Sequence, residues 1–268
     1  MASPTLRPAL REGDPSTAFE RRYGVRKSAV LALAWGGAGL LAVFALLLAW
    51  GPGRALAFEW LTDERGPVEL STFIGFMIAA VLAWRLSARA RRENSRGGAA
   101  LGYALFAGIC LFAALEEISW GQSLFDFHGP AWLVNLNEQG ETNLHDLPGL
   151  MDLNSAFVMA FGLAGCVATR LSRFGRCRDL AVPSALAPLF MLIAGMGALE
   201  TINDVALLGD RLASLIGTLS EAVEMLGAFG CVAYVLLNAR MLERQWRGTH
   251  AVDAIGAESL TVPDQAAA

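Results

Sequence analysis

The chain has few charged residues and few cysteines for its length. Only 17% of its 268 residues are Asp, Glu, Lys or Arg, against about 25% in a typical soluble domain, and 54% are hydrophobic. The formal net charge of −4 provides no basic field for a polyanion, which argues against a nucleic-acid partner. Four cysteines without paired spacing argue against a disulfide framework. We interpret Cys110, Cys166 and Cys231 as small core residues.

The sequence also lacks the common catalytic signatures. It contains no Gly-rich phosphate loop and no HExxH, GxSxG or CxxC motif. The enzyme classes that depend on those motifs are therefore not indicated. The distribution of apolar and charged residues along the chain is the main source of information.

Six apolar runs are each long enough to cross a hydrocarbon core of about 30 Å as a helix of about 20 residues. Because backbone groups in lipid must bond within their own segment, we expect helices. We predict an all-α, polytopic membrane helical bundle with its transmembrane domain over residues 28–240. Glycines such as Gly162, Gly195 and Gly197 are expected to allow close helix packing. The six predicted spans cover residues 28–50, 68–88, 99–118, 153–171, 181–201 and 214–237.

Lys and Arg collect on alternate connections, which predicts the orientation. The N-terminal arm (residues 1–27) holds six, the connections after the second and fourth spans hold five and four, and the segment after the sixth holds three. The opposite side holds only Arg54, Arg65 and Arg211. Since basic connections are retained in the cytoplasm, both termini are predicted to be cytoplasmic. We expect a multi-pass protein of the bacterial inner membrane, with a solvated arm and a disordered cytoplasmic tail over residues 241–268.

The connection over residues 119–152 is the longest and is predicted to face outward. It contains no Lys or Arg but five acidic residues and two of the three histidines, and it keeps large apolar residues such as Trp120 and Trp132. A loop of this length in a compact protein is either disordered or functional. Its apolar content indicates a long structured outer loop. We predict a short helix from Pro130 through Asn137.

Acidic residues also lie within the predicted spans, on the outer side. Glu116 and Glu117 end the third span, and Glu200 ends the fifth. In the sixth span, Glu221 lies about 10 Å deep and Glu224 about 15 Å deep, at 1.5 Å per residue. An ionisable residue at this depth costs about 2.5–3.5 kcal/mol, so it faces the bundle interior with a partner or a proton. The alternative is a neutral carboxyl that only hydrogen-bonds between helices.

A divalent metal would neutralise these carboxylates. Glu141 and His145 have the i, i+4 spacing that lets two side chains of a helix reach one ion, although a surface hydrogen bond is the alternative. Oxygen ligands with one imidazole suit Zn, Mn, Fe or Ca better than copper. Glu116 or Glu224 is the candidate general base. The candidate metal ligands are Glu117, Glu141, His145, Glu200 and Glu221.

Part of this region resembles a known family. The stretch Glu116-Glu117-Ile118-Ser119-Trp120-Gly121-Gln122, followed by Glu141-Thr142-Asn143-Leu144-His145, resembles a signature of uncharacterised multi-pass bacterial inner-membrane proteins. The resemblance covers residues 116–145 and implies a polytopic membrane fold without an assigned activity. The family pattern tends to have Asn where this chain has Asp146, so the charge at that position differs.

Three functions fit these features. The favoured one is a metal-dependent, membrane-embedded enzyme acting on a lipid or lipid-linked substrate at the outer face, because the acidic site lies at interface depth beside aromatic loop residues. The second is a proton- or cation-coupled transporter with Glu221 and Glu224 as its relay, although the inner halves of the spans show no continuous trail of polar residues, with only Ser184 in the fifth and Asn238 at the end of the sixth. The third is a non-catalytic assembly subunit whose outer loop binds a partner.

Overall fold

The structure is a computed structural model. It describes residues 15–260 except 51–52, 64–65, 94, 96–97, 126, 138–139, 141, 145–146, 150–152, 176 and 207–208. The described elements are all helical, and six helical segments are long and apolar enough to cross a membrane. The predicted all-α fold is confirmed for this part of the chain, as is the number of membrane-length apolar helices. The six are α2 (Lys27–Ala49), α4 (Pro67–Arg92), α5 (Ala99–Glu117), α8 (Asn154–Ala168, continued by the 3-10 turn η4, Thr169–Arg173), α9 (Ala187–Ala206) and α10 (Asp210–Leu260).

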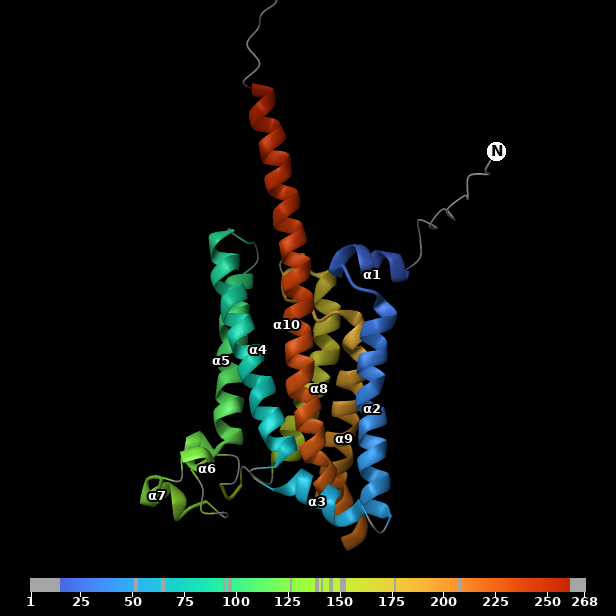
Figure 1. Ribbon diagram of the computed structural model, residues 1–268, viewed down its shortest axis with the longest axis vertical. Coiled ribbons are helices and arrows are strands. Elements are labelled where there is room, and N and C mark those ends of the chain that lie inside the picture. Colours follow the sequence, from blue (N-terminus) through green and yellow to red (C-terminus); the bar gives the residue numbers. More distant parts are fainter. Residues whose placement is uncertain are drawn as a thin grey trace, which may run out of the picture.

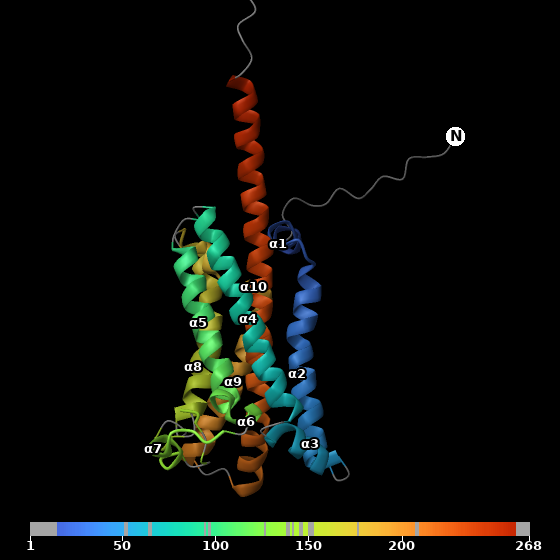
Figure 2. The same cartoon turned by 60° about the vertical axis from the view of Figure 1, so that its left-hand side comes forward.

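Helix α10 is the centre of the bundle (Figure 1; Figure 2). It packs against α4 on one side and α9 on another, and it also contacts α2. Helix α5 packs mainly on α4, and α8 packs mainly on α9. The bundle therefore consists of two close helix pairs, α4–α5 and α8–α9, that are joined through α10.

Glycines let these helices approach each other closely. A Cβ at Gly162 of α8 would lie 2.3 Å from the backbone nitrogen of Ala194, and a Cβ at Gly197 of α9 would lie 2.4 Å from that of Met159. The predicted packing role is confirmed at these two positions. It is wrong for Gly195, where a Cβ would meet nothing within 4 Å, because this glycine faces away from α8.

The two ends of the bundle carry different elements. One end, which we name the loop end, carries α3 (Arg54–Thr62), α6 (Gln122–Phe125) and α7 (Ala131–Val134) (Figure 1). The other end, named the tail end, carries α1 (Pro15–Tyr23), and from it the last part of α10 projects beyond the other helices. Helix α7 starts directly after Pro130, as predicted, and ends before the expected Asn137.

The N-terminal arm contains a helix that packs on the bundle, where the sequence predicts a solvated segment. Phe19 and Tyr23 of α1 are buried, and α1 contacts α2 and α10. Nη2 of Arg22 donates to the backbone oxygen of Arg178 at 3.1 Å. The prediction is therefore wrong for residues 15–23, because two aromatic side chains on one helical face are sufficient to dock this short helix.

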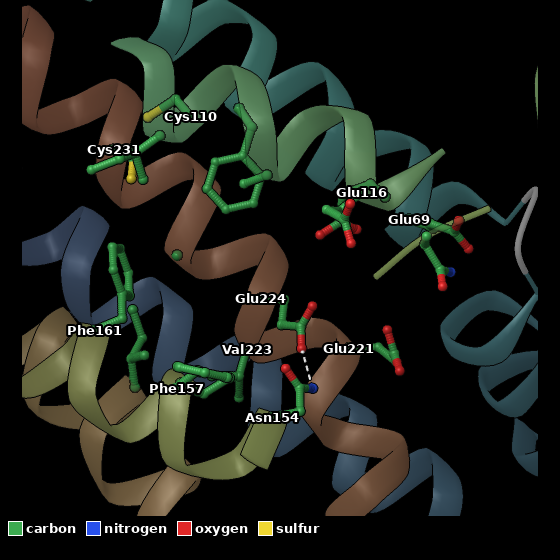
Figure 3. A pocket seen from close by; sticks show the side chains of 18 of the residues that line it. Glu69, Cys110, Glu116, Asn154, Phe157, Phe161, Glu221, Val223, Glu224 and Cys231 are labelled. Carbon is green, nitrogen blue, oxygen red and sulfur yellow. Dashed lines mark hydrogen bonds between the residues drawn. The ribbon is translucent and has the colours of Figure 1, made fainter. Parts of the chain in front are cut away.

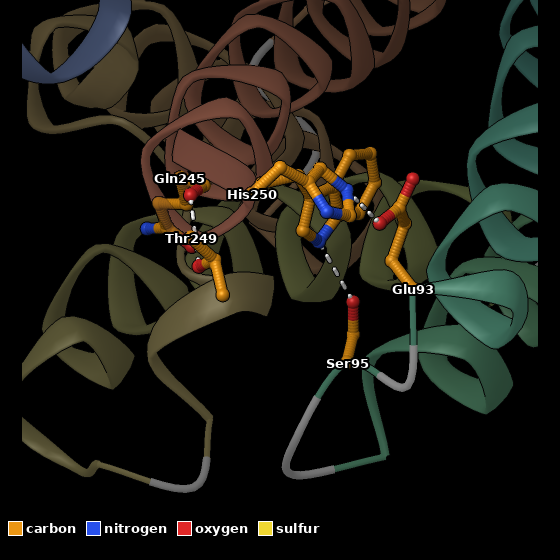
Figure 4. Close-up of polar contacts among 6 residues, drawn as sticks. Glu93, Ser95, Gln245, Thr249 and His250 are labelled. Carbon is orange, nitrogen blue, oxygen red and sulfur yellow. Dashed lines mark hydrogen bonds and ion pairs between the residues drawn. The ribbon is translucent and has the colours of Figure 1, made fainter. Parts of the chain in front are cut away.

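The last helix continues where the sequence predicts a disordered tail. Met241 and Trp246 of α10 are buried, and Nε1 of Trp246 donates to Oγ of Ser95 at 3.2 Å (Figure 4). The guanidinium of Arg89 lies 5.0 Å from the centre of the indole ring. The prediction of disorder is wrong for residues 241–260, because α10 continues through them as a helix. The contacts of Trp246 hold the first part of this segment beside the end of α4.

We expect Trp246→Phe to lower the free energy of unfolding by about 1 kcal/mol, because the ring stays in place but no longer donates to Ser95. His250→Ala is the matched control on the same helix. His250 pairs with Glu93 at 2.9 Å in an exposed position (Figure 4), where such pairs contribute about 0.5 kcal/mol or less. Thermal unfolding in detergent measures both variants. If His250→Ala lowers the free energy of unfolding more than Trp246→Phe does, the stabilising role of the Trp246 hydrogen bond is contradicted.

Candidate functional site

A cavity of about 600 Å³ lies inside the bundle between α4, α5, α8 and α10 (Figure 3). This volume falls in the range of about 300–1,000 Å³ that is typical of small-molecule sites. We name it the acidic pocket because five glutamates line it. They are Glu69 of α4, Glu116 and Glu117 of α5, and Glu221 and Glu224 of α10.

The acidic pocket is polar at one end and apolar at the other. Along α5 its lining residues run from Phe106 through Cys110 to Glu117, and along α10 they run from Cys231 back to Glu221. At 1.5 Å per residue, the first and last of these are about 15 Å apart on each helix. Helix α5 ends and α10 begins at the loop end, so the carboxylates of both helices lie on that side of the cavity.

The opposite end of the acidic pocket is built from aromatic rings and two thiols. Phe76, Phe106 and Phe161 line it together with Cys110 and Cys231. The two thiols are buried and belong to one small core cluster. This agrees with the interpretation of both cysteines as core residues, and it leaves this end of the cavity without charge among the described residues.

The acidic pocket carries charge of one sign. Among the described residues that line it, none is Lys, Arg or His. Glu117 is half-buried and shares the pocket with the four other carboxyl groups. Like charges held together away from bulk water favour the uptake of an opposite charge or of a proton. The pocket therefore favours an occupant that carries positive charge.

Glu224 is positioned by a contact from α8. Nδ2 of Asn154, the first residue of α8, donates to Oε1 of Glu224 at 3.2 Å (Figure 3). Both side chains line the acidic pocket. The bond fixes one carboxylate oxygen of Glu224 and ties α8 to α10 across the cavity.

Glu116 connects α5 to the loop that follows it. Its side chain is only 7% exposed, and both carboxylate oxygens accept hydrogen bonds. Nε1 of Trp120 donates to Oε1 at 2.5 Å, and the backbone nitrogen of Leu144 donates to Oε2 at 2.7 Å. Because charge-assisted bonds of this kind are the strong ones, Glu116 fastens two separate parts of the loop to the end of α5.

A tight turn follows α5 directly. Ser119 and Trp120 have positive φ angles of 46° and 56°, which is uncommon for residues other than glycine, and Gly121 follows with φ 97°. The hydroxyl of Thr142 donates to the backbone oxygen of Ser119, and Nδ2 of Asn143 donates to its Oγ at 3.3 Å. These bonds from the far part of the loop stabilise the unusual backbone of the turn.

Asn143 links this turn to the pocket. It is buried, it lines the acidic pocket, and its side-chain oxygen accepts a bond of 2.7 Å from Nδ2 of the buried Asn137. Ser119 accepts bonds within the same network. Six described positions of the stretch that carries the family resemblance are therefore joined by hydrogen bonds, and two of them, Glu116 and Asn143, line the loop end of the cavity.

The structure brings only part of the predicted site together. Glu116, Glu117, Glu221 and Glu224 all line the acidic pocket, whereas Glu200 does not. Oε2 of Glu200 accepts a bond of 2.8 Å from Oγ of Ser220 on α10. Ser220 and Glu221 are adjacent on α10 and point about 100° apart. Glu200 therefore approaches a different face of α10 from the one that lines the pocket.

The predicted metal site is not assembled by the part of the chain that the structure describes. No group of three or more His, Cys, Asp or Glu side chains there is close enough to hold a metal ion. Glu141 and His145, and also Asp146, lie outside the described residues. The metal site stays a prediction that depends on the first two.

Sequence reasoning missed Glu69, Asn154 and Asn143 as lining residues. Glu69 lies in the first turn of α4, where an acid is also explained by its interaction with the helix dipole. Asn154 begins α8, where a polar residue is equally common as a helix start. The available signal is that Glu69 and Asn154 each lie at an end of a span on the same side as the carboxylates, and that Asn143 lies in the loop on that side.

Comparison with known proteins finds no match, since no family model, no curated protein and no solved structure is similar to this chain. The class is therefore defined by the fold and the cavity alone. It is a helical multi-pass protein with six membrane-length apolar helices and an acidic pocket inside the bundle. A function has to be argued from the residues of that pocket.

Proposed function

We propose that this chain is an enzyme of the bacterial inner membrane that acts on a lipid or lipid-linked substrate, with the loop end outside and both termini in the cytoplasm. The polar and apolar ends of the acidic pocket support this function, because an amphipathic molecule matches both at once. The orientation is supported by the arginines of the tail end. Arg22, Arg89 and Arg244 all make contacts there.

Glu224 is the better candidate for the general base. A base must bring an oxygen within hydrogen-bond reach of the proton that it removes. Both oxygens of Glu116 are bonded to the loop, which makes Glu116 a positioning residue. Glu224 lines the pocket beside Asn154, which orients it toward an occupant.

The test is lipid turnover by the purified protein in vesicles of total bacterial membrane lipids, followed by mass spectrometry. We expect at least one lipid species to be consumed, and we expect Glu224→Gln to slow this by about 10²–10⁴-fold, the usual contribution of a general base. Glu243→Gln is the control, because Glu243 pairs with Arg89 at the tail end, far from the pocket. If the wild-type protein leaves the composition of the lipids unchanged, the proposed enzymatic function is wrong.

A divalent cation is proposed as a cofactor, with Zn, Mn, Fe or Ca as candidates. It would supply Lewis-acid chemistry and offset part of the charge of the pocket. Glu117 and Glu221 are the candidate ligands within the pocket, together with Glu141 and His145 of the loop. Metal analysis of the purified protein is expected to find about one equivalent. Glu117→Ala should lose it and Glu59→Ala, at an exposed site on α3, should keep it. A metal-free wild type would contradict the cofactor.

A proton- or cation-coupled transporter is the second candidate, favoured by the five carboxylates of the pocket. Against it, the lining residues toward the tail end are aromatic rings and thiols, so the polar path stops inside the bundle. Flux assays in proteoliposomes separate the two functions. Cation flux that disappears in Glu224→Gln, without lipid turnover, would replace the enzyme by the transporter.

A further inference from the structure

The acidic pocket reaches the lateral surface of the helix bundle between α5 and α8. Ile109 of α5 and Phe157 of α8 both line the pocket, yet they are 64% and 59% exposed. A residue that lines a cavity and is also exposed lies at its opening. Figure 3 shows Phe157 and Phe161 of α8 on the opposite side of the pocket from Cys110 of α5. One opening is therefore on the side of the bundle, along the length of two spans. By the same criterion, Thr62 and Glu221, which line the pocket and are exposed, mark a second opening at the loop end.

The packing of the helices explains the opening. Helix α5 packs extensively on α4, and α8 packs extensively on α9, whereas the described residues of α5 and α8 make no extensive contact with each other. Helix α10 closes the back of the cavity through Val223 and Gly227. Among the described residues, the two helix pairs thus make no extensive contact with each other through α5 and α8.

The position of the opening decides which molecules can use it. Ile109 lies eight residues before Glu117 on α5, which is about 12 Å toward the tail end. In a membrane this part of a span is surrounded by acyl chains. An occupant that enters between α5 and α8 therefore comes from the hydrocarbon layer, so it is a lipid and not a dissolved molecule.

The charge of the pocket decides which lipid it recognises. Its lining residues offer five carboxylates and, within the described chain, no basic side chain. An ammonium group is attracted by such a site, whereas an anionic headgroup meets only like charge. The cavity of about 600 Å³ has room for a headgroup and the start of a chain. The rest of a two-chain lipid stays in the bilayer, reached through the opening.

We propose that a lipid with an ammonium-bearing headgroup enters the acidic pocket sideways between α5 and α8. Its ammonium group lies among the carboxylates, and its chain passes Ile109 and Phe157 into the bilayer. This inference rests on the proposed function in using the same pocket, and it names the class of substrate and its route.

The test is photo-crosslinking in vesicles of phosphatidylethanolamine and phosphatidylglycerol, in which one lipid at a time carries a diazirine at the start of an acyl chain. Mass spectrometry locates the adducts on the full-length protein. We expect the ethanolamine probe to label lining residues such as Phe106 and Phe161 about tenfold more than the glycerol probe does. Labelling of the lipid-facing Leu33 and Trp35 on α2 should be equal for both probes.

The opening itself is tested by filling it. The double variant Ile109→Trp, Phe157→Trp is expected to reduce labelling of the pocket by about tenfold and to leave labelling of α2 unchanged. The matched control is Leu105→Trp, Leu163→Trp. These positions lie on the same two helices and are similarly exposed, but they do not line the pocket.

Three outcomes would overturn the inference. The first is equal labelling of the pocket by both probes, and the second is unchanged labelling when the opening is filled. The third is that millimolar free ethanolamine displaces the probe from the pocket of the double variant, in which the opening is filled. The last would show that the site takes a soluble amine from the loop end. Crosslinking reports binding alone, so it is separate from turnover. If the lipid probe labels the pocket but no lipid is turned over, the route inferred here stands and the proposed enzymatic function is wrong. If lipid turnover persists when the opening is filled, the enzymatic function stands and the route is wrong.

Discussion

Gly197→Val is expected to prevent the protein from folding. A Cβ at this position would lie 2.4 Å from the backbone nitrogen and 2.8 Å from the Cα of Met159, and 2.9 Å from the backbone oxygen of Ser155. Backbone atoms of a packed helix cannot move aside as a flexible side chain can, and the two methyl groups of valine add to the clash. The cost exceeds the 1–3 kcal/mol typical of overpacking, so α8 and α9 should separate.

Gly195→Val is the matched control, two residues away on the same helix. Gly195 is exposed, and a Cβ there meets nothing within 4 Å, so this variant should fold and keep the thermal stability of the wild type. Size-exclusion chromatography and thermal unfolding in detergent compare the two. Gly162→Val tests the same contact from α8, where the added Cβ would lie 2.3 Å from the backbone nitrogen of Ala194. Similar behaviour of Gly195→Val and Gly197→Val would contradict the close packing of α8 and α9.

Glu116→Ala is expected to lower the free energy of unfolding by about 3 kcal/mol and to release part of the loop. Two donors, Nε1 of Trp120 and the backbone nitrogen of Leu144, lose a charged acceptor, and hydrogen bonds to charged groups contribute about 1.5–3 kcal/mol each. Hydrogen exchange at the Leu144 amide should become much faster. Because Asn143 lines the acidic pocket next to Leu144, the loop end of the cavity should also lose its shape.

Glu117→Gln, at the neighbouring position, is expected to act in the opposite direction. Glutamine has nearly the shape of glutamate and carries no charge into a pocket lined by four other carboxyl groups, so it adds no repulsion among them. The free energy of unfolding should not fall, and exchange at Leu144 should stay slow. Thermal unfolding and hydrogen exchange of both variants under one set of conditions test this contrast. Loss of stability in Glu117→Gln equal to that in Glu116→Ala would argue against separate roles for the two adjacent glutamates.

The number and approximate positions of the membrane-length helices could be predicted from the sequence, because an apolar run of about 20 residues has one economical structure in lipid. The tails could not. Phe19 and Tyr23 on α1, and Met241 and Trp246 on α10, are too few to stand out from a polar segment. Each set becomes significant only when another helix lies beside it, as α10 does for α1 and α4 does for the end of α10.

The site was predicted in part for a similar reason. Glu116, Glu117, Glu221 and Glu224 stand out because charged residues are rare inside apolar helices. Glu69 and Asn154 lie in the first turn of their helices, where polar residues are common, so nothing in the sequence marks them as lining residues. Thr142 and Asn143 act through hydrogen bonds to a turn more than twenty residues earlier, a distance that local spacing does not reveal.

By itself, the sequence determined that the chain forms six membrane-length helices, that a structured loop joins the third to the fourth, and that acidic and basic residues are segregated between alternate connections. Composition and run length are enough for this, because the cost of unpaired backbone groups in lipid depends on each segment alone. Only the tertiary structure decided which carboxylates share a cavity. That depends on how each helix is rotated about its axis, and a difference of about 100° separates Ser220, which bonds Glu200, from Glu221, which faces the pocket.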